Sequence, residues 1–210
     1  MFLTQFILDP QSRQVQRELA NRYELHRTLT AQFPALKRED IGLLYRLEMP
    51  EGYQYSAIKL LVQTRVEPCW DNLWHKGLLL EVPEVKAFDI PSTVGEMFYF
   101  RLVANPTVRR KQAAGEKGQR VGLYKSGEQE AWLKRKAEGA GFEVLALRLR
   151  DLGMIESRKQ TSGRTYVIQH QAVQFEGGLQ VSDPDRFRRT IIHGMGRAKA
   201  FGFGLLSLAK

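Results

Sequence analysis

The sequence has few of the residues that bind metals or form covalent cross-links: one cysteine, Cys69, and four histidines in 210 residues. A single cysteine cannot form a disulfide within the chain, and the CxxC pairs of a zinc site are absent. No H-E-x-x-H motif and no carboxylate cluster typical of a two-metal site occurs, so we expect no metal and no other cofactor. Cys69 follows Pro68 at the entry to a turn, where we expect its thiol to be packed.

Long apolar runs are also missing. No stretch approaches the ~20 residues that a membrane-spanning helix needs. The N-terminus lacks the charged segment and following apolar segment of a secretory signal. We therefore expect no membrane partner and a location in the reducing cytoplasm.

Positive charge, by contrast, is abundant. Lysine and arginine number 32 against 23 acidic residues, a net charge of +9. This excess favours a polyanionic partner, and nucleic acid is the first candidate. The alternative is a basic protein without such a partner, because net charge governs association rather than fold. Hydrophobic residues make up 43% of the chain, enough to bury a core.

Hydrophobic periodicity predicts that the first half alternates strands and helices. A helix over residues 12–33, with a kink near Asn21, follows the first strand. A short helix over residues 70–76 precedes the last strand of this half. The expected strands cover residues 2–8, 43–49, 56–66 and 85–90.

The second half repeats this alternation, starting near residue 92. We expect a polar basic loop over 105–119, and a turn at Gly177-Gly178. Two such halves predict an α+β fold of two sandwiches, each a sheet with helices on one face. The expected helices cover residues 126–138 and 183–192, and the strands cover 96–104, 142–149, 165–175, 179–181 and 203–208.

Tyr23, His26 and Arg27 form the first candidate site. Residues three apart on a helix share a face, so Tyr23 and His26 can converge on one point. A histidine near neutral pH can move the proton of a ribose 2′-hydroxyl, and a guanidinium can hold the phosphate oxygens. The alternative is an ordinary amphipathic helix with a half-buried tyrosine and a hydrogen-bonded histidine.

Basic clusters gather in the second half and form a candidate RNA-binding surface. Residues 156–164 resemble the tip of a hairpin, and a basic ribbon of this kind can enter a nucleic-acid groove. A solvated charged face is the alternative for any single cluster. The candidate residues are Arg109, Arg110, Lys111, Lys134, Arg135, Arg158, Lys159 and Arg164.

The C-terminal stretch combines glycines with cations. Glycine permits a positive φ and a close approach of backbone to ligand, and exposed N–H groups beside cations can cradle a phosphate. The position at the end of the chain fits neither the dinucleotide-binding fingerprint nor the P-loop. The residues concerned are Gly194, Gly196, Gly202 and Gly204, with the cations Arg197 and Lys199.

Together these features resemble a known family, the repeat-RNA endoribonucleases of the type I-E CRISPR Cascade complex (the CasE family). The similarity covers essentially the whole chain, beginning at Phe2-Leu3-Thr4. Its most specific parts are the Tyr-x-x-His block of residues 21–29 and the terminal glycine-rich block of residues 194–208, in this order. Further matching stretches are residues 44–48, 62–64, 67–70, 100–107 and 172–177.

The resemblance implies a fold of two tandem ferredoxin-like (RRM-like) domains, residues 1–91 and residues 92–210. It implies binding of the CRISPR repeat RNA hairpin and cleavage of pre-crRNA at the 3′ base of the stem. The cut proceeds without a metal and leaves a 2′,3′-cyclic phosphate. The protein then stays on the crRNA as a subunit of Cascade, whose other subunits are its partners.

The same resemblance assigns roles to residues. His26 is the principal acid/base residue, with Tyr23 beside it at the scissile phosphate. Arg158, Lys159 and Arg164 enter the deep groove of the RNA stem, with the glycine-rich loop nearby. The alternative hypothesis is a non-catalytic RNA-hairpin-binding scaffold of the same fold. Such a scaffold would need neither His26 nor Tyr23.

Overall fold

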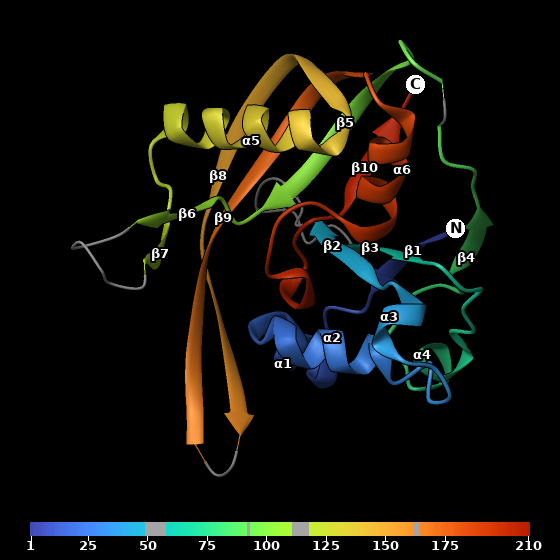
Figure 1. Cartoon of the computed structure of the whole chain (residues 1–210). Coiled ribbons are helices and arrows are strands. Elements are labelled where there is room, and N and C mark those ends of the chain that lie inside the picture. Colours follow the sequence, from blue (N-terminus) through green and yellow to red (C-terminus); the bar gives the residue numbers. More distant parts are fainter. Residues whose placement is uncertain (49–57, 92, 111–117, 162–163) are drawn as a thin grey trace.

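Two four-stranded antiparallel sheets, one from each half of the chain, frame the computed structural model, which describes residues 1–48, 58–91, 93–110, 118–161 and 164–210 (Figure 1). Helices accompany both sheets, so the expected α+β class is confirmed. None of the helices within these residues has the length and apolar character needed to cross a bilayer.

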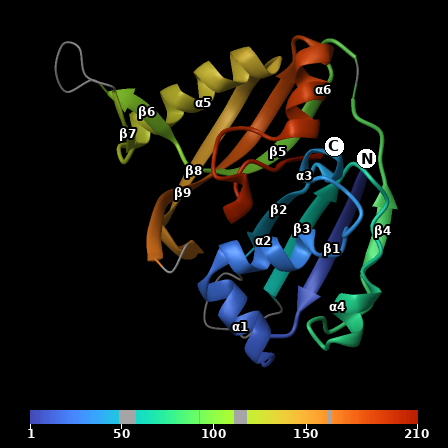
Figure 2. The same cartoon turned by 60° about the horizontal axis from the view of Figure 1, so that its bottom comes forward.

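The first sheet has the strand order β2-β3-β1-β4, which Figure 2 shows side by side. The expected kink at Asn21 is confirmed, because the long helix is divided there into two. In chain order the elements are β1 (Phe2–Leu8), α1 (Arg13–Ala20), α2 (Arg22–Thr30), α3 (Arg38–Ile41), β2 (Leu44–Glu48), β3 (Ile58–Thr64), α4 (Asp71–His75) and β4 (Glu84–Ala87).

The second sheet has the order β10-β5-β9-β8, with a separate two-stranded ribbon of β6 and β7. Both sheets share one topology. If β5, β8, β9 and β10 are numbered one to four in chain order, the second sheet, followed from β8 to β10, has the order 2-3-1-4, as in the first sheet. In chain order the elements are β5 (Met97–Ala104), β6 (Thr107–Arg110), β7 (Gln119–Gly122), α5 (Ser126–Ala140), β8 (Phe142–Thr161), β9 (Arg164–Val181), α6 (Pro184–His193), the 3₁₀-helix η1 (Lys199–Phe201) and β10 (Leu206–Ala209).

The predicted turn at Gly177-Gly178 is wrong. Strand β9 runs straight through both glycines, and Gly177 pairs with Phe100 on one side and Leu147 on the other. A Cβ at Gly177 would overlap the carbonyl oxygen of Ala146, beside an irregularity in β8. The glycines therefore permit a close approach of two strands rather than a reversal of the chain.

Two other boundaries differ from expectation. The predicted basic loop over 105–119 contains β6, which pairs with β7 in the ribbon. The final strand begins at Leu206 rather than at residue 203, because the glycines before it have positive φ values that a strand does not use.

Helix ends follow local sequence signals. The side chain of Asp183 accepts a hydrogen bond from the backbone N–H of Arg186 at 3.0 Å, and Pro184 occupies the first turn of α6. Gly194, with φ of 72°, ends that helix, and Gly141, with φ of 82°, ends α5. The end of α6 at Gly194 marks where the glycine-rich segment begins.

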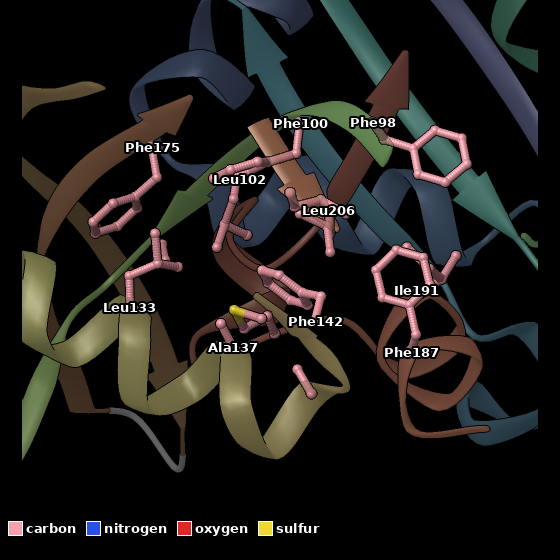
Figure 3. Close-up of a cluster of buried hydrophobic side chains, with 14 of the residues drawn as sticks. Phe98, Phe100, Leu102, Leu133, Ala137, Phe142, Phe175, Phe187, Ile191 and Leu206 are labelled. Atoms are coloured by element: carbon pink, nitrogen blue, oxygen red, sulfur yellow. The ribbon is translucent and has the colours of Figure 1, made fainter. Parts of the chain in front are cut away.

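Each sheet has its own hydrophobic core. In the second half, α5 and α6 cover one face of the sheet, and side chains such as Leu133, Phe142 and Phe187 meet between the layers (Figure 3). In the first half, α2 and α4 pack on the sheet through Leu25, Leu29 and other residues.

The thiol of Cys69 joins neither core. It is exposed and donates to Asp71 at 3.3 Å, so the expectation of a packed thiol is wrong.

The other face of the first sheet meets the C-terminal segment. Side chains alternate between the two faces of a strand, so Tyr45 enters the first core while Arg46 points toward the second half of the molecule. Arg46 donates to the carbonyl oxygen of Arg101 at 3.1 Å, and Gln63 on β3 donates to the carbonyl oxygen of Ile191 at 2.8 Å. Strands β2 and β3 are thus bonded to β5 and α6 of the second half.

Candidate functional site

Helix α2, strand β8 and the short helix η1 meet at one place in the molecule. The ring of Tyr23 on α2 lies 6.0 Å from the ring of Phe201 on η1, centre to centre. Ile155 of β8 packs into the same apolar cluster. The Tyr-x-x-His block and the glycine-rich block, far apart in sequence, are therefore neighbours.

His26 lies one helical turn from Tyr23 and is 8% exposed. Its ring is stacked on that of Tyr45, with centres 6.3 Å apart and planes inclined by 17°. Burial, and secondly the charge of Arg38, lowers the pKa of His26 to about 4. Its Nδ1 is buried and has no hydrogen-bond partner among the described residues, unlike the histidine of an ordinary packed helix. The imidazole is therefore neutral at neutral pH.

Tyr45 connects this helix to the glycine-rich segment. Its hydroxyl lies 2.9 Å from the carbonyl oxygen of Arg22 and 3.1 Å from that of Ala200, and shares its proton between them. Burial raises the pKa of Tyr45, which keeps the hydroxyl protonated. No chemical signal in the sequence marks Tyr45, although the alternation of residues 43–49 would place it on the face of the strand that packs against helices.

The glycine-rich segment is a folded loop with a fixed backbone. Gly194, Gly196, Gly202 and Gly204 all have positive φ values, as does Ala198. Residues 195 and 204 approach closely. The N–H of Met195 donates to the carbonyl oxygen of Gly204, and a Cβ at Gly204 would lie 2.6 Å from the carbonyl oxygen of Met195.

The two cations of this segment differ in environment. Arg197 is exposed. Lys199 is partly buried, and this burial lowers its pKa. Lys199 belongs to η1, the short helix that contacts α2, and its charge is one of those acting on His193.

The β8–β9 hairpin extends past α1 and α2 and beyond the body of the molecule (Figure 1). Arg158 on β8 has an exposed side chain, 3.6 Å from the carboxylate of Glu156. The backbones of Lys159 and Arg164 belong to β8 and β9, whereas their side chains lie outside the described part of the structure. Of the predicted hairpin cations, Arg158 is thus the one whose side chain is placed, and it stands near the start of α2.

The remaining predicted cations are dispersed. Arg27 is exposed and paired with Glu24 at 3.0 Å, on α2 itself. Arg109 and Arg110 are exposed on β6, and Lys111 lies outside the described residues. Lys134 and Arg135 are exposed on α5, which stands well away from α2 in both Figure 1 and Figure 2. The structure therefore does not bring these two into the site at α2.

A second histidine also lies close to the site. The ring centre of His170 is 4.8 Å from that of Phe201, and its Nδ1 lies 2.8 Å from the side-chain nitrogen of Asn105. Ser157, on the neighbouring strand, is 2% exposed, and its hydroxyl has no partner among the described residues. No local signal marked these residues, because their burial arises from contacts between distant segments.

Metal-ligating groups are not assembled in the described residues. No set of three or more histidine, cysteine, aspartate or glutamate side chains there is placed to hold an ion. The groups at the meeting point of α2, β8 and η1 are instead a neutral imidazole, a phenol and arginine or lysine side chains. This set is typical of proteins that bind and process RNA.

Comparisons with known proteins agree with this class. Residues 1–210 match the family described as CRISPR associated protein. The chain is 39% identical over 218 residues to the CRISPR-associated endoribonuclease Cse3 of Thermus thermophilus, with full coverage of both chains. It is 33% identical over 198 residues to the Cascade subunit CasE of Escherichia coli, covering 89% of this chain and 91% of CasE. The chain therefore belongs to the CRISPR-associated endoribonuclease family of Cse3 and CasE.

The solved structures agree with the sequence relationship. The structure of the endoribonuclease Cse3 bound to a 19-nucleotide RNA matches this chain with a TM-score of 0.85 and 39% identity, covering all of both chains. The arrangement of the two antiparallel sheets is therefore that of the family.

Proposed function

We propose that this protein binds the CRISPR repeat RNA hairpin and cuts pre-crRNA at the 3′ base of the stem. The observation that carries the proposal is the position of His26: a buried, neutral imidazole next to Tyr23, where α2, the basic hairpin and the glycine-rich segment meet. Family membership supports the same activity, since Cse3 is an endoribonuclease that has been seen bound to RNA.

The chemistry needs only groups that the chain supplies. The ribose 2′-oxygen gives up its proton and attacks the adjacent phosphorus, while the bond from phosphorus to the 5′-oxygen breaks. The products are a 2′,3′-cyclic phosphate and a 5′-hydroxyl, which receives a proton. His26 moves the proton, Tyr23 orients the reacting group beside it, and cations stabilise the charge on the phosphate oxygens. No metal is required for this route.

The basic residues divide into two groups in this proposal. Arg158, with Lys159 and Arg164 near the end of the hairpin, enters the deep groove of the stem, and Arg27, Arg197 and Lys199 lie closer to the scissile phosphate. Phosphate contacts of this kind fix position, while the shape of the RNA hairpin provides recognition. Arg109, Arg110, Lys111, Lys134 and Arg135 would contact RNA away from the cut.

We also infer the domain organisation and the partners. The common strand order of the two sheets supports two ferredoxin-like domains, residues 1–91 and residues 92–210. After cleavage the protein stays on its crRNA and joins Cascade in the cytoplasm. The similarity to the Cascade subunit CasE supports this last step.

The test is cleavage of a labelled CRISPR repeat hairpin in EDTA. Wild-type protein should cut it, whereas His26→Ala should bind but not cut. RNA with a single 2′-deoxy substitution at the cleavage site should resist both proteins. His75→Ala is the matched control, because His75 is exposed on α4 and should leave cutting unchanged. Tight binding without cutting by the wild type would identify a non-catalytic scaffold instead.

A further inference from the structure

Asn21 stands at the junction of α1 and α2, two residues before Tyr23. Its backbone caps both helices: its N–H donates to the carbonyl oxygen of Arg17, and its carbonyl oxygen accepts from Glu24 at 2.9 Å. Asparagine at the N-cap, the residue just before the first helical one, usually caps the helix with its side chain. Here the side chain makes no capping hydrogen bond, and is directed elsewhere.

The amide of Asn21 pairs with the backbone of a strand 137 residues away. Its Nδ2 donates to the carbonyl oxygen of Arg158 at 2.9 Å, and the N–H of Arg158 donates to Asn21 Oδ1 at 3.2 Å. Strand β8 is at the edge of its sheet, so one row of its backbone groups has no strand partner. The side chain of Asn21 thus pairs with the outer edge of β8 as a residue of a neighbouring strand would, and these two hydrogen bonds form the Asn21–Arg158 rung.

This rung fixes the hairpin relative to α2. Two opposed hydrogen bonds to one residue set both the distance and the register between a helix and a strand, which a single bond does not. Both bonds are exposed to solvent, so their net contribution to stability is small. Their main effect is geometric, because Arg158 belongs to the hairpin and His26 to the helix.

We propose that Asn21 is a positioning residue that holds the basic hairpin in register with the helix of His26. This inference rests on the proposed function, since its consequence is a correct placement of RNA held by the hairpin over the imidazole. A small misplacement of a bound substrate lowers the rate of the chemical step more than it lowers affinity. Loss of the rung should therefore change cleavage and leave binding nearly intact.

The test uses Asn21→Ser, because serine caps a helix as well as asparagine but is too short to span to Arg158. Single-turnover cleavage of a repeat hairpin at saturating protein should slow by about tenfold, with the Kd changed by less than about threefold. Asn21→Asp keeps the acceptor for the Arg158 N–H and loses the donor, so its rate should lie between the two. Asn72→Ser, at an exposed asparagine on α4, is the matched control and should match the wild type.

Hydrogen exchange gives a readout that needs no RNA. The Arg158 amide should exchange about tenfold faster in Asn21→Ser than in the wild type, because its acceptor is gone. Unchanged exchange together with unchanged cleavage would overturn the proposal, as would an equal loss of affinity and rate. If the wild type does not cut RNA, the proposed function fails, while faster exchange at Arg158 would still confirm the rung itself.

Discussion

The guanidinium of Arg46 on β2 donates a hydrogen bond to the hydroxyl of Ser207 on β10, across 2.8 Å and 161 positions in the sequence. Arg46 is 3% exposed and also pairs with Glu48 at 2.6 Å. Glu48 in turn contacts Arg101, which pairs with Glu176 on β9. Arg46 thus ties the first sheet to β5 and β10, and the ion pairs around it extend this link to β9.

Replacement of Arg46 by methionine should lower the free energy of unfolding by about 3 kcal/mol. Methionine keeps part of the side-chain volume, but it removes the buried donor to the carbonyl oxygen of Arg101 and the ion pair with Glu48. Urea unfolding measures this change. Ser207→Ala removes one of several partners and should cost about 1 kcal/mol. Equal stability of Arg46→Met and wild type would show that the network does not hold the two sheets together.

The buried state of His26 should make stability depend on pH. The folded protein binds a proton at His26 only near pH 4, whereas the unfolded chain binds it near pH 6.5. The stabilising contribution is therefore complete above pH 6.5 and is lost as the pH falls toward 4.

Urea unfolding at pH 7 and pH 5 tests this dependence. Between these values the wild type should lose about 2 kcal/mol more than His26→Gln, which cannot take up the proton. Burial also lowers the pKa of His170 and of His193, but both remain in the variant and cancel in the comparison. The same loss in both proteins would mean that His26 is solvated and titrates normally.

Gly204→Ala should damage the loop that carries Arg197 and Lys199. The φ of Gly204 is 90°, and the added Cβ would meet the carbonyl oxygen of Met195 at 2.6 Å. We expect a loss of at least about 2 kcal/mol in unfolding free energy, together with slower cleavage.

Gly139→Ala is the control for that substitution. Gly139 lies in the last turn of α5 with no atom within 4 Å of its added Cβ, so alanine should stabilise the helix by about 0.5 kcal/mol. A Gly204→Ala protein as stable as the wild type would show that the loop adapts its backbone freely.

RNA affinity should fall with salt, because phosphate contacts release counterions. Arg158→Gln should weaken binding and make the plot of log K against log salt concentration shallower by about one unit. Lys76→Gln, at an exposed lysine after α4, should leave the slope unchanged. An unchanged slope for Arg158→Gln would remove Arg158 from the RNA surface.

Local signals in the sequence predicted α5 and α6, whereas the short helix α3 was not predicted. Asp183 and Pro184 marked the start of α6, and Gly141 marked the end of α5, because capping depends on residues next to the helix. The kink near Asn21 was predicted from the hydrophobic spacing of residues 12–33. The pair Gly177-Gly178 wrongly predicted a turn. Glycine occurs both in turns and where two strands approach closely, and only the pairing of Gly177 with Phe100 and Leu147 distinguishes the two cases.

The sequence by itself determined the class of the fold, the excess of positive charge that favours a nucleic-acid partner, and the placement of Tyr23 and His26 on one helix. Periodicity, composition and spacing are local properties, and they are written directly in the order of residues. The tertiary structure alone decided that Tyr45 joins α2 to Ala200, that Asn21 holds Arg158, and that His26 is buried and neutral. Those features arise from packing between segments that are distant in the chain, and burial and pKa depend on that packing rather than on neighbours in sequence.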